Sequence, residues 1–395
     1  MTGTAPIYLD HAASAPLDPR VAAIMAECLA DPSLQANPSS AHAAGRRAAE
    51  RIATARAQVA ALIGAPPDAI VFTSGATESV NLAILGAARA AGRERRHVVT
   101  SRIEHHAGRE ACRQLEREGF DVTWLRPTPE GFVEPRQVAE ALRPDTALVS
   151  LIQANNETGV LNDIDAVGAL CRARDVTLHV DAVQSAGKLP IDVATGGVAL
   201  LSFCAHKIAG PKGVGALYVR RRPRPALQPL QFGGSHEGGL RPGTLATHQL
   251  VGFGAACELA RMALDTEPVR IRALREQLWL ALQAAAPLWR NGAPEPSVPG
   301  ILNVGFAGVE GESLLLELDG RLAVASGAAC SSATAEPSAV LRALGRSDLA
   351  IQASLRLSLG RDTTVQDVDR AAALLVAAVQ RLRGVLPAGA LERIA

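Results

Sequence analysis

Short apolar runs alternate with longer helical stretches through most of this chain, and this alternation limits the folds that it can adopt. Residues 47–64 place apolar side chains at helical spacing and end on Gly64, a residue type that often follows a helix. Residues 69–92 read as a short strand, a glycine-containing turn and a helix. Strands that alternate with helices in this way predict an α/β fold, with a mostly parallel sheet covered by helices on both faces. Further strand-like runs begin the segments 97–107, 121–127, 146–159, 176–183 and 198–207.

The last third of the chain has a different pattern. A long helical region is interrupted near Pro268 and is followed by a turn rich in proline and glycine. Two later apolar runs indicate strands of a second sheet, and an amphipathic helix follows them. These segments are the helical region 254–286, the turn 291–300, the runs 301–306 and 355–360, and the helix 365–385.

The length of 395 residues is enough for two domains. The change of pattern places the boundary between them near residue 260. We therefore expect a large domain over residues 15–260, and a smaller α+β domain formed by residues 1–14 and 261–395.

Composition and charge exclude several classes of protein. Hydrophobic residues make up 48% of the chain and charged residues 20%, as in an ordinary globular protein. The net charge of +1 gives no indication of binding to nucleic acid or to an anionic membrane. No apolar run approaches the roughly 18–20 residues that span a bilayer, and the N-terminus has no secretory signal pattern. We expect a cytoplasmic enzyme.

The six cysteines are scattered along the chain without a CxxC pair, which argues against a structural zinc site, and we expect no metal. Scattered cysteines are usually buried thiols. Cys330 differs because it lies among small residues, in the segment 324–341. Composition alone leaves two interpretations of Cys330 open. It could be a buried structural cysteine, or a thiol on a segment that can move.

Three segments place polar groups at the ends of predicted strands. Lys207 precedes a glycine-rich turn, where a lysine can also be a simple surface charge. Asp181 ends an apolar run, where a carboxylate is costly to bury without a cation or donor, although it could instead cap a helix. Residues 74–77 join a strand to a helix, where free backbone N–H groups suit a phosphate, or where the hydroxyls simply cap the helix. Together the amine, the carboxylate and the phosphate cradle are what pyridoxal 5′-phosphate requires.

Several longer motifs occur in order along the chain and carry a family resemblance. The chain resembles the pyridoxal-phosphate-dependent cysteine desulfurases of iron–sulfur cluster assembly and nitrogen fixation, in the class V aminotransferase family, from about Ile7 to Arg361. The resemblance implies a fold-type-I transferase with a mostly parallel seven-stranded sheet, acting as a homodimer with active sites at the subunit interface. The motifs are "YLDHAASAPLDPRV", "NPSSAHAAGR", "FTSGATES", "EHHA", "NNETG", "HVDAVQSAGKLPID", "HKIAGPKGVGALYVRR", "RPGTLATHQ" and "SGAACSSATAEPSAVLRALG".

The resemblance also implies roles for individual residues. Lys207 matches the lysine that forms a Schiff base with the cofactor, Asp181 the partner of the pyridine nitrogen, and His105 the histidine that stacks on the ring. Cys330 matches the cysteine that accepts the substrate sulfur as a persulfide. The other implied cofactor contacts are Ala76, Thr77, Gln184, Cys204, His206 and, from the opposite subunit, Thr244, and the implied substrate contacts are Asn155, Arg356 and Asn37.

The activity implied is conversion of L-cysteine to L-alanine, with the sulfur held on Cys330. The sulfur would pass to an acceptor or iron–sulfur scaffold protein, for cluster assembly or tRNA thiolation. A selenocysteine lyase or an aminotransferase would share Lys207 and Asp181, and a non-catalytic partner in sulfur transfer is a further alternative.

The chain departs from the common family pattern at a few positions. Cys204 stands where a serine usually contacts the phosphate, and a thiol is a weaker donor than a hydroxyl. Gly238 and Pro242 replace an arginine and a serine in a loop near the family's dimer interface. The opening motif is also altered, at residues 11–15. These changes fall at implied contacts of the cofactor phosphate and of the substrate side, and leave Lys207 and Asp181 in place.

Overall fold

A computed structural model describes residues 6–326 and 337–385 of the chain. It contains one large sheet, whose central strands are buried along their whole length. Burial on both faces explains why a strand such as 146–152 reads as a continuous apolar run and not as an alternating one. The strands of this sheet are β2 (Ile70–Thr73), β3 (His97–Ser101), β4 (Asp121–Leu125), β5 (Thr146–Ile152), β6 (Thr177–Asp181), β7 (Leu200–Cys204) and β8 (Gly215–Val219).

The seven strands lie in the order β2-β8-β7-β6-β5-β3-β4, and β8 runs antiparallel to both of its neighbours. The pairs among β3, β4, β5, β6 and β7 are parallel. Only residues 205–214 connect β7 to β8, too short a connection for the crossover that a parallel pair requires. The prediction of a mostly parallel, seven-stranded sheet is therefore confirmed.

Helices cover both faces of the large sheet. Adjacent residues of β3 point to opposite faces: Val98 packs with α3 and α4, and Val99 with the helices on the other face. α1 (Pro19–Ala30) packs outside this layer, against α7. The first face carries α3 (Ala76–Ala90) and α4 (His106–Arg117), and the second α2 (Ala43–Ala61), α5 (Pro135–Ala141), α6 (Ile164–Ala173) and α7 (Thr247–Ala263).

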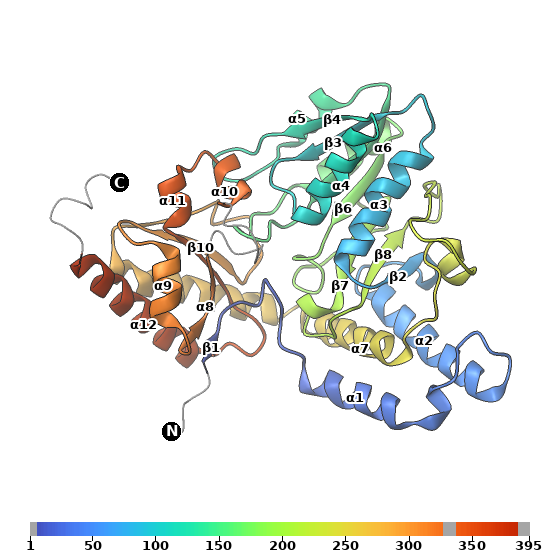
Figure 1. Ribbon diagram of the computed structural model, residues 1–395, viewed down its shortest axis with the longest axis horizontal. Helices are drawn as coiled ribbons and strands as arrows, with labels where there is room; N and C mark the ends of the chain where they lie inside the picture. Colours follow the sequence, from blue (N-terminus) through green and yellow to red (C-terminus); the bar gives the residue numbers. More distant parts are fainter. Residues whose placement is uncertain (1–5, 327–336, 386–395) are drawn as a thin grey trace.

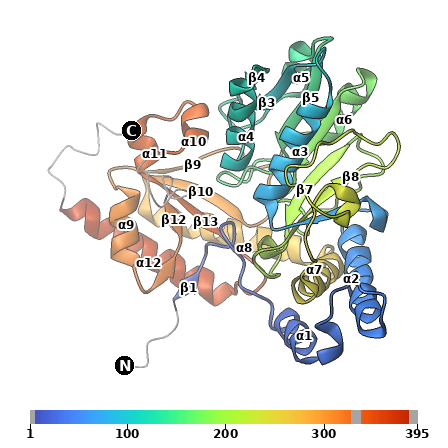
Figure 2. The same ribbon diagram turned by 45° about the vertical axis from the view of Figure 1, so that its right-hand side comes forward.

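A second sheet has the antiparallel order β12-β13-β10-β9. Figures 1 and 2 show the large sheet with its helices on one side of the molecule, and the small sheet with α8, α9 and α12 on the other. The break predicted near Pro268 is where α8 begins, with proline tolerated in the first turn. The elements are β9 (Leu288–Arg290), β10 (Ile301–Phe306), β12 (Ala325–Ser326), β13 (Ser354–Ser358), α8 (Glu267–Leu282), α9 (Gly311–Leu318), α10 (Ala339–Ala343), α11 (Asp348–Gln352) and α12 (Val365–Gly384).

The start of the described chain runs between the two sheets. β1 (Ile7–Tyr8) pairs in parallel with β11 (Leu322–Ala323), on the side of the small sheet. The backbone N–H of His11 then donates to the carbonyl of Ser358 in β13, and that of Ala15 to the carbonyl of His206. Residues 11–15 are thereby held next to the turn that follows β7.

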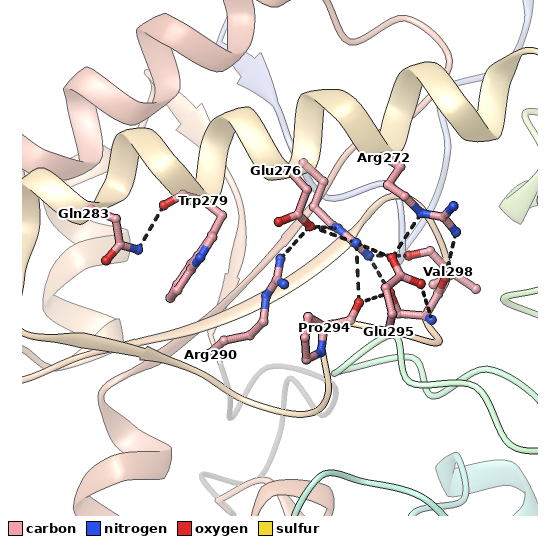
Figure 3. Close-up of polar contacts among 10 residues, drawn as sticks. Arg272, Glu276, Trp279, Gln283, Arg290, Pro294, Glu295 and Val298 are labelled. Carbon is pink, nitrogen blue, oxygen red and sulfur yellow. Dashed lines mark hydrogen bonds and ion pairs between the residues drawn. The ribbon is translucent and has the colours of Figure 1, made fainter.

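A buried arginine fixes the turn predicted at residues 291–300 against α8. Arg275 is 2% exposed and donates to the Oγ of Ser297 at 2.6 Å and to the carbonyl oxygen of Val298 at 3.0 Å. It also pairs with Glu295 at 2.9 Å. Figure 3 shows the surrounding contacts, with Arg272 and Glu276 of α8 facing the turn that carries Glu295.

The turn 291–300 is also hydrogen-bonded to a loop of the large sheet, because the N–H of Val298 donates to the carbonyl of Gly159.

Among the helices of the described residues, none has the length and apolar character needed to span a membrane.

Candidate active site

A cavity of about 680 Å³ lies where the C-terminal ends of the parallel strands face β13. The ends of β5 and β6, the turn after β7 and the start of α3 all contribute to its wall, the usual place for a ligand in a sheet of this kind. Residues 12–14 and Arg356 contribute from the opposite side. Of the predicted site residues, Ala76, Thr77, His105, Asp181, Gln184, His206, Lys207 and Arg356 line this one cavity.

Lys207 ends the short 3₁₀ helix Ala205–Lys207, directly after β7. Its Nζ donates to the carbonyl oxygens of Ala12 at 2.6 Å and Ala13 at 2.8 Å. Both acceptors belong to the segment that crosses between the sheets, so the amine is held at the cavity wall by uncharged acceptors. An amine held in this way can exchange these contacts for a bound carbonyl compound.

Asp181 is the last residue of β6 and is only 5% exposed. Its Oδ1 accepts a hydrogen bond from the N–H of Val183 at 3.0 Å. Burial raises the pKa of the Asp181 carboxyl to about 6, and the nearby charge of Lys207 opposes part of this shift. A buried carboxyl group of this kind is suited to a cationic or N–H partner inside the cavity.

His105 caps the N-terminus of α4, because its Nδ1 accepts a hydrogen bond from the backbone N–H of Ala107 at 3.1 Å. Burial, and next the charge of Lys207, lower the pKa of His105 to about 4. The imidazole is therefore neutral near pH 7. Since Nδ1 accepts, the proton of the neutral ring is on Nε2.

The start of α3 forms the other end of the cavity. The helix follows Gly75, which has no side chain to cap the first turn, so the terminal backbone N–H groups are available to an anion. His206 lies beside this end, with its Nδ1 3.3 Å from the Oγ of Ser14. Burial, followed by the charge of Lys207, lowers the pKa of His206 to about 4.

Arg356, in β13, brings a buried guanidinium to the cavity. One terminal nitrogen pairs with Asp10 at 2.9 Å and the other donates to the carbonyl of Asn156 at 3.1 Å. In the described part of the chain, neither the Nε of Arg356 nor the Oδ1 of Asn156 has a hydrogen-bond partner, although both are buried. Two unsatisfied buried groups on one wall indicate that a polar ligand completes this end of the cavity.

Asn155, predicted to contact the substrate, is not among the described residues that line this cavity, and its role stays a prediction. Its Nδ2 donates to the carbonyl of Ile103, and its Oδ1 accepts from the backbone N–H groups of Glu157 and Thr158. The amide oxygen thus shapes its own turn, and one N–H of the amide ties that turn to Ile103. The next residue, Asn156, takes the place on the wall.

Three other predicted residues are not among the described lining of this cavity, and one falls outside the described residues. Cys204 is buried and does not belong to the described lining of the cavity, and burial raises the pKa of its thiol to about 11. Asn37 and Thr244 lie together instead, at a second cavity of about 270 Å³. Cys330 lies outside the residues that the structure describes.

The sequence reasoning missed two kinds of residue. Asn156 was adjacent to a predicted residue in the same motif, and a sequence cannot tell which of two neighbouring asparagines faces inward. The carbonyls of Ala12 and Ala13 gave no signal, because backbone acceptors leave no trace in residue type. Lys212 also lines the cavity and was visible only as a lysine in the glycine-rich turn.

Comparisons with known proteins show the family to which the chain belongs. The family model of class-V aminotransferases matches residues 7–371. A curated relative, the cysteine desulfurase IscS of Aeromonas hydrophila subsp. hydrophila, is 52% identical over 97% of this chain and 95% of its own length. A solved structure of a NifS-like protein is 32% identical, with a TM-score of 0.88 over 96% of this chain and 100% of its own. The structure of SspA in complex with cysteine is 37% identical, with a TM-score of 0.80 over 90% of this chain and 99% of its own.

Proposed function

Because the chain belongs to the class-V aminotransferase family, and within it to the cysteine desulfurases, we propose that it takes the sulfur of L-cysteine onto Cys330 and releases L-alanine. The enzyme is pyridoxal-phosphate-dependent, as this family is. The observation that carries the proposal is the meeting of Lys207, Asp181 and Arg356 at one cavity.

The residues present fit the cofactor. The start of α3 and His206 would hold its phosphate, Asp181 its ring nitrogen and Gln184 its ring hydroxyl, with His105 against the ring. The support is physical: a buried carboxyl group at the end of β6, an uncapped helix terminus and a cavity of about 680 Å³. When bound, pyridoxal phosphate supplies an electron sink for breaking bonds at the substrate Cα.

The chain's own residues then orient the substrate and move its proton. Arg356 would bind the carboxylate of L-cysteine, since its buried Nε has no acceptor among the described residues, and the Oδ1 of Asn156 would accept from an N–H group of the ligand. Lys207 would take the proton from the substrate Cα, because its Nζ is held at the cavity wall by exchangeable contacts. His105, neutral and protonated on Nε2, would donate a hydrogen bond without adding charge.

Sulfur transfer needs a thiol, and the described residues that line the cavity include no cysteine. Cys330 is proposed for this role on the motif around it. Its sulfur would bond to the substrate Sγ, whose bond to Cβ breaks, and Cβ receives the proton that completes alanine. We propose that the persulfide sulfur then passes to an acceptor protein for iron–sulfur cluster assembly or tRNA thiolation.

We also propose a homodimer in the cytoplasm. Thr244 and Asn37 lie at a cavity separate from that of Lys207, which supports a role for them in the site of a second copy. The five described cysteines are free thiols, as is usual in a reducing compartment.

Turnover of L-cysteine with a reductant tests the proposal. We expect equal amounts of sulfide and alanine, loss of both in Lys207→Ala, and loss of sulfide in Cys330→Ser. Cys112→Ala is the matched control, because burial raises the pKa of that thiol to about 12 and makes it unreactive. Alanine formation that requires an added keto acid, or full turnover by Cys330→Ser, would contradict the proposed reaction.

A further inference from the structure

The chain contains three lysines, Lys188, Lys207 and Lys212, and all its other side-chain cations of this class are arginines. Lys207 and Lys212 line the large cavity, and Lys188 lines a smaller cavity of about 70 Å³ on the other side of Lys207. Two lysines therefore lie at the candidate site, and the third lies in a cavity that shares Lys207 with it. Lysine differs from arginine in being compact and able to lose its proton, so these positions use a property that arginine lacks.

Lys188 is connected to the site through Gln184. Its Nζ donates to the Oε1 of Gln184 at 2.9 Å. The Nε2 of Gln184 donates in turn to the carbonyl oxygen of Ala12 at 2.8 Å, and the Nζ of Lys207 donates to the same oxygen at 2.6 Å. One chain of hydrogen bonds thus joins the two lysines through a side-chain amide and a backbone carbonyl.

This chain of hydrogen bonds determines which end of the Gln184 amide reaches the cavity. An amide can present either its oxygen or its NH₂ group, whereas an ammonium group can only donate. Lys188 therefore holds the oxygen on its own side, and the NH₂ group is turned toward Ala12 and the cavity wall. The cavity receives a donor at this position and not an acceptor.

Lys188 is partly buried, and two cations, Lys207 and Arg356, lie close enough to lower its pKa. The pKa of Lys188 responds to three groups, Lys207, Arg356 and Cys204. The smaller cavity that Lys188 lines is also lined by His11, Glu267 and Arg361. Burial, and next the charge of Lys207, lower the pKa of Lys188 to about 7. A group that can release its proton tolerates this environment better than a permanently charged guanidinium.

We propose that Lys188 is a positioning residue of the active site, which acts through the Gln184 amide and presents its NH₂ group as a donor toward the bound cofactor. The proposal rests on the proposed function, because that function assigns Gln184 to the ring hydroxyl of pyridoxal phosphate. Lys188 itself is not among the described residues that line the large cavity, so it would act through Gln184.

The test compares Lys188→Met, Gln184→Ala and the double variant. The measurements are the dissociation constant of pyridoxal phosphate from the apoenzyme and the absorbance spectrum of the bound cofactor. We expect each single variant to weaken binding by about tenfold or more, as for loss of a hydrogen bond to a charged group. Both should shift the cofactor band alike, and the double variant should be no weaker than Gln184→Ala alone.

Lys188→Arg keeps the positive charge but replaces the compact ammonium group with a planar guanidinium. We expect it to weaken the binding of pyridoxal phosphate as Lys188→Met does. Arg93→Met, in an exposed turn, removes a cation elsewhere and should leave both measurements unchanged. The proposal would be overturned if Lys188→Met or Lys188→Arg bound pyridoxal phosphate as tightly as the wild type. It would also be overturned if the losses of the two single variants added up in the double variant. Wild-type enzyme that binds the cofactor but releases no sulfide would instead refute the proposed function, since the binding measurements need no turnover.

Discussion

Glu104 is a buried acid beside the site whose protonation should control stability. It is 3% exposed and accepts a hydrogen bond from the Oγ of Ser101. Burial raises the pKa of its carboxyl from 4.5 to about 8, against the effect of that hydrogen bond. A raised pKa favours the folded state at low pH, and this contribution is lost as the pH rises through about 8.

Glu104→Gln keeps the shape of the side chain and removes this titration. We expect the variant apoenzyme to match wild type near pH 5 and to be more stable near pH 8, by on the order of 1–3 kcal/mol. Urea unfolding at the two pH values measures the difference. An equal effect of the substitution at both pH values would show that the carboxyl does not titrate in this range.

The residue types in the sequence predicted which chemical groups form the site, but not which of these side chains face the cavity. Lys207 and Asp181 could be inferred because an amine, a carboxylate and a phosphate cradle occur together at strand ends, within motifs that resemble a known family. Asn155 and Asn156 are chemically identical, and only the backbone of the turn decides which one faces the cavity. Cys204 ends β7 with its thiol buried, a direction that residue type does not encode.

At the scale of elements, α8 and the turn 291–300 act as one unit through Arg275. Loss of this side chain leaves the Oγ of Ser297 and the carbonyl of Val298 without their donor. We expect Arg275→Met to reduce stability by about 2–4 kcal/mol, because the guanidinium is buried. It should also raise the KM for L-cysteine, since Val298 is bonded to Gly159 in the loop that carries Asn156.

Arg272→Met is the matched control from the same cluster. Arg272 pairs with Glu295 at 3.1 Å, but its side chain is 42% exposed, so its loss should cost less than about 1 kcal/mol. Thermal unfolding and steady-state kinetics of both variants measure these effects. Equal losses in the two variants would mean that burial of Arg275 is not what stabilises the turn.

The kinds of elements followed from sequence periodicity, but their arrangement did not. Alternation predicted strands, helices and a mostly parallel sheet, because each element must bury its own apolar face. The reversal of β8 was missed, although the short connection 205–214 contained the signal. Strand order depends on contacts between segments far apart in the chain, and local patterns do not record these.

At the scale of the whole molecule, the two sheets meet at the site. α7 packs on the large sheet and α8 with the small one, and the predicted boundary near residue 260 stays a prediction. The segment 11–15, which looked unremarkable in the sequence apart from its altered motif, joins the two halves and supplies the acceptors of Lys207. Contacts of this kind connect residues nearly 350 positions apart, such as Ala12 with Ser358, which lie 346 apart.

The proposed homodimer predicts that an impaired variant and an inactive variant can complement one another. Thr244 lies at a different cavity from Lys207, so in a dimer each site would combine Lys207 of one chain with Thr244 of the other. Thr244→Ala should weaken cofactor binding, and Lys207→Ala should abolish activity. A mixed dimer of the two variants contains one intact site.

After the two variants are unfolded and refolded together in equal amounts, about half of the dimers are mixed, and activity should rise to about a quarter of wild type. The variants refolded separately and then combined without exchange are the control. Sulfide release from L-cysteine measures the recovery, and analytical ultracentrifugation confirms the dimers. Recovery no greater than the mean of the two variants, in preparations with mixed dimers present, would mean that Thr244 acts within its own subunit, or not at the site at all.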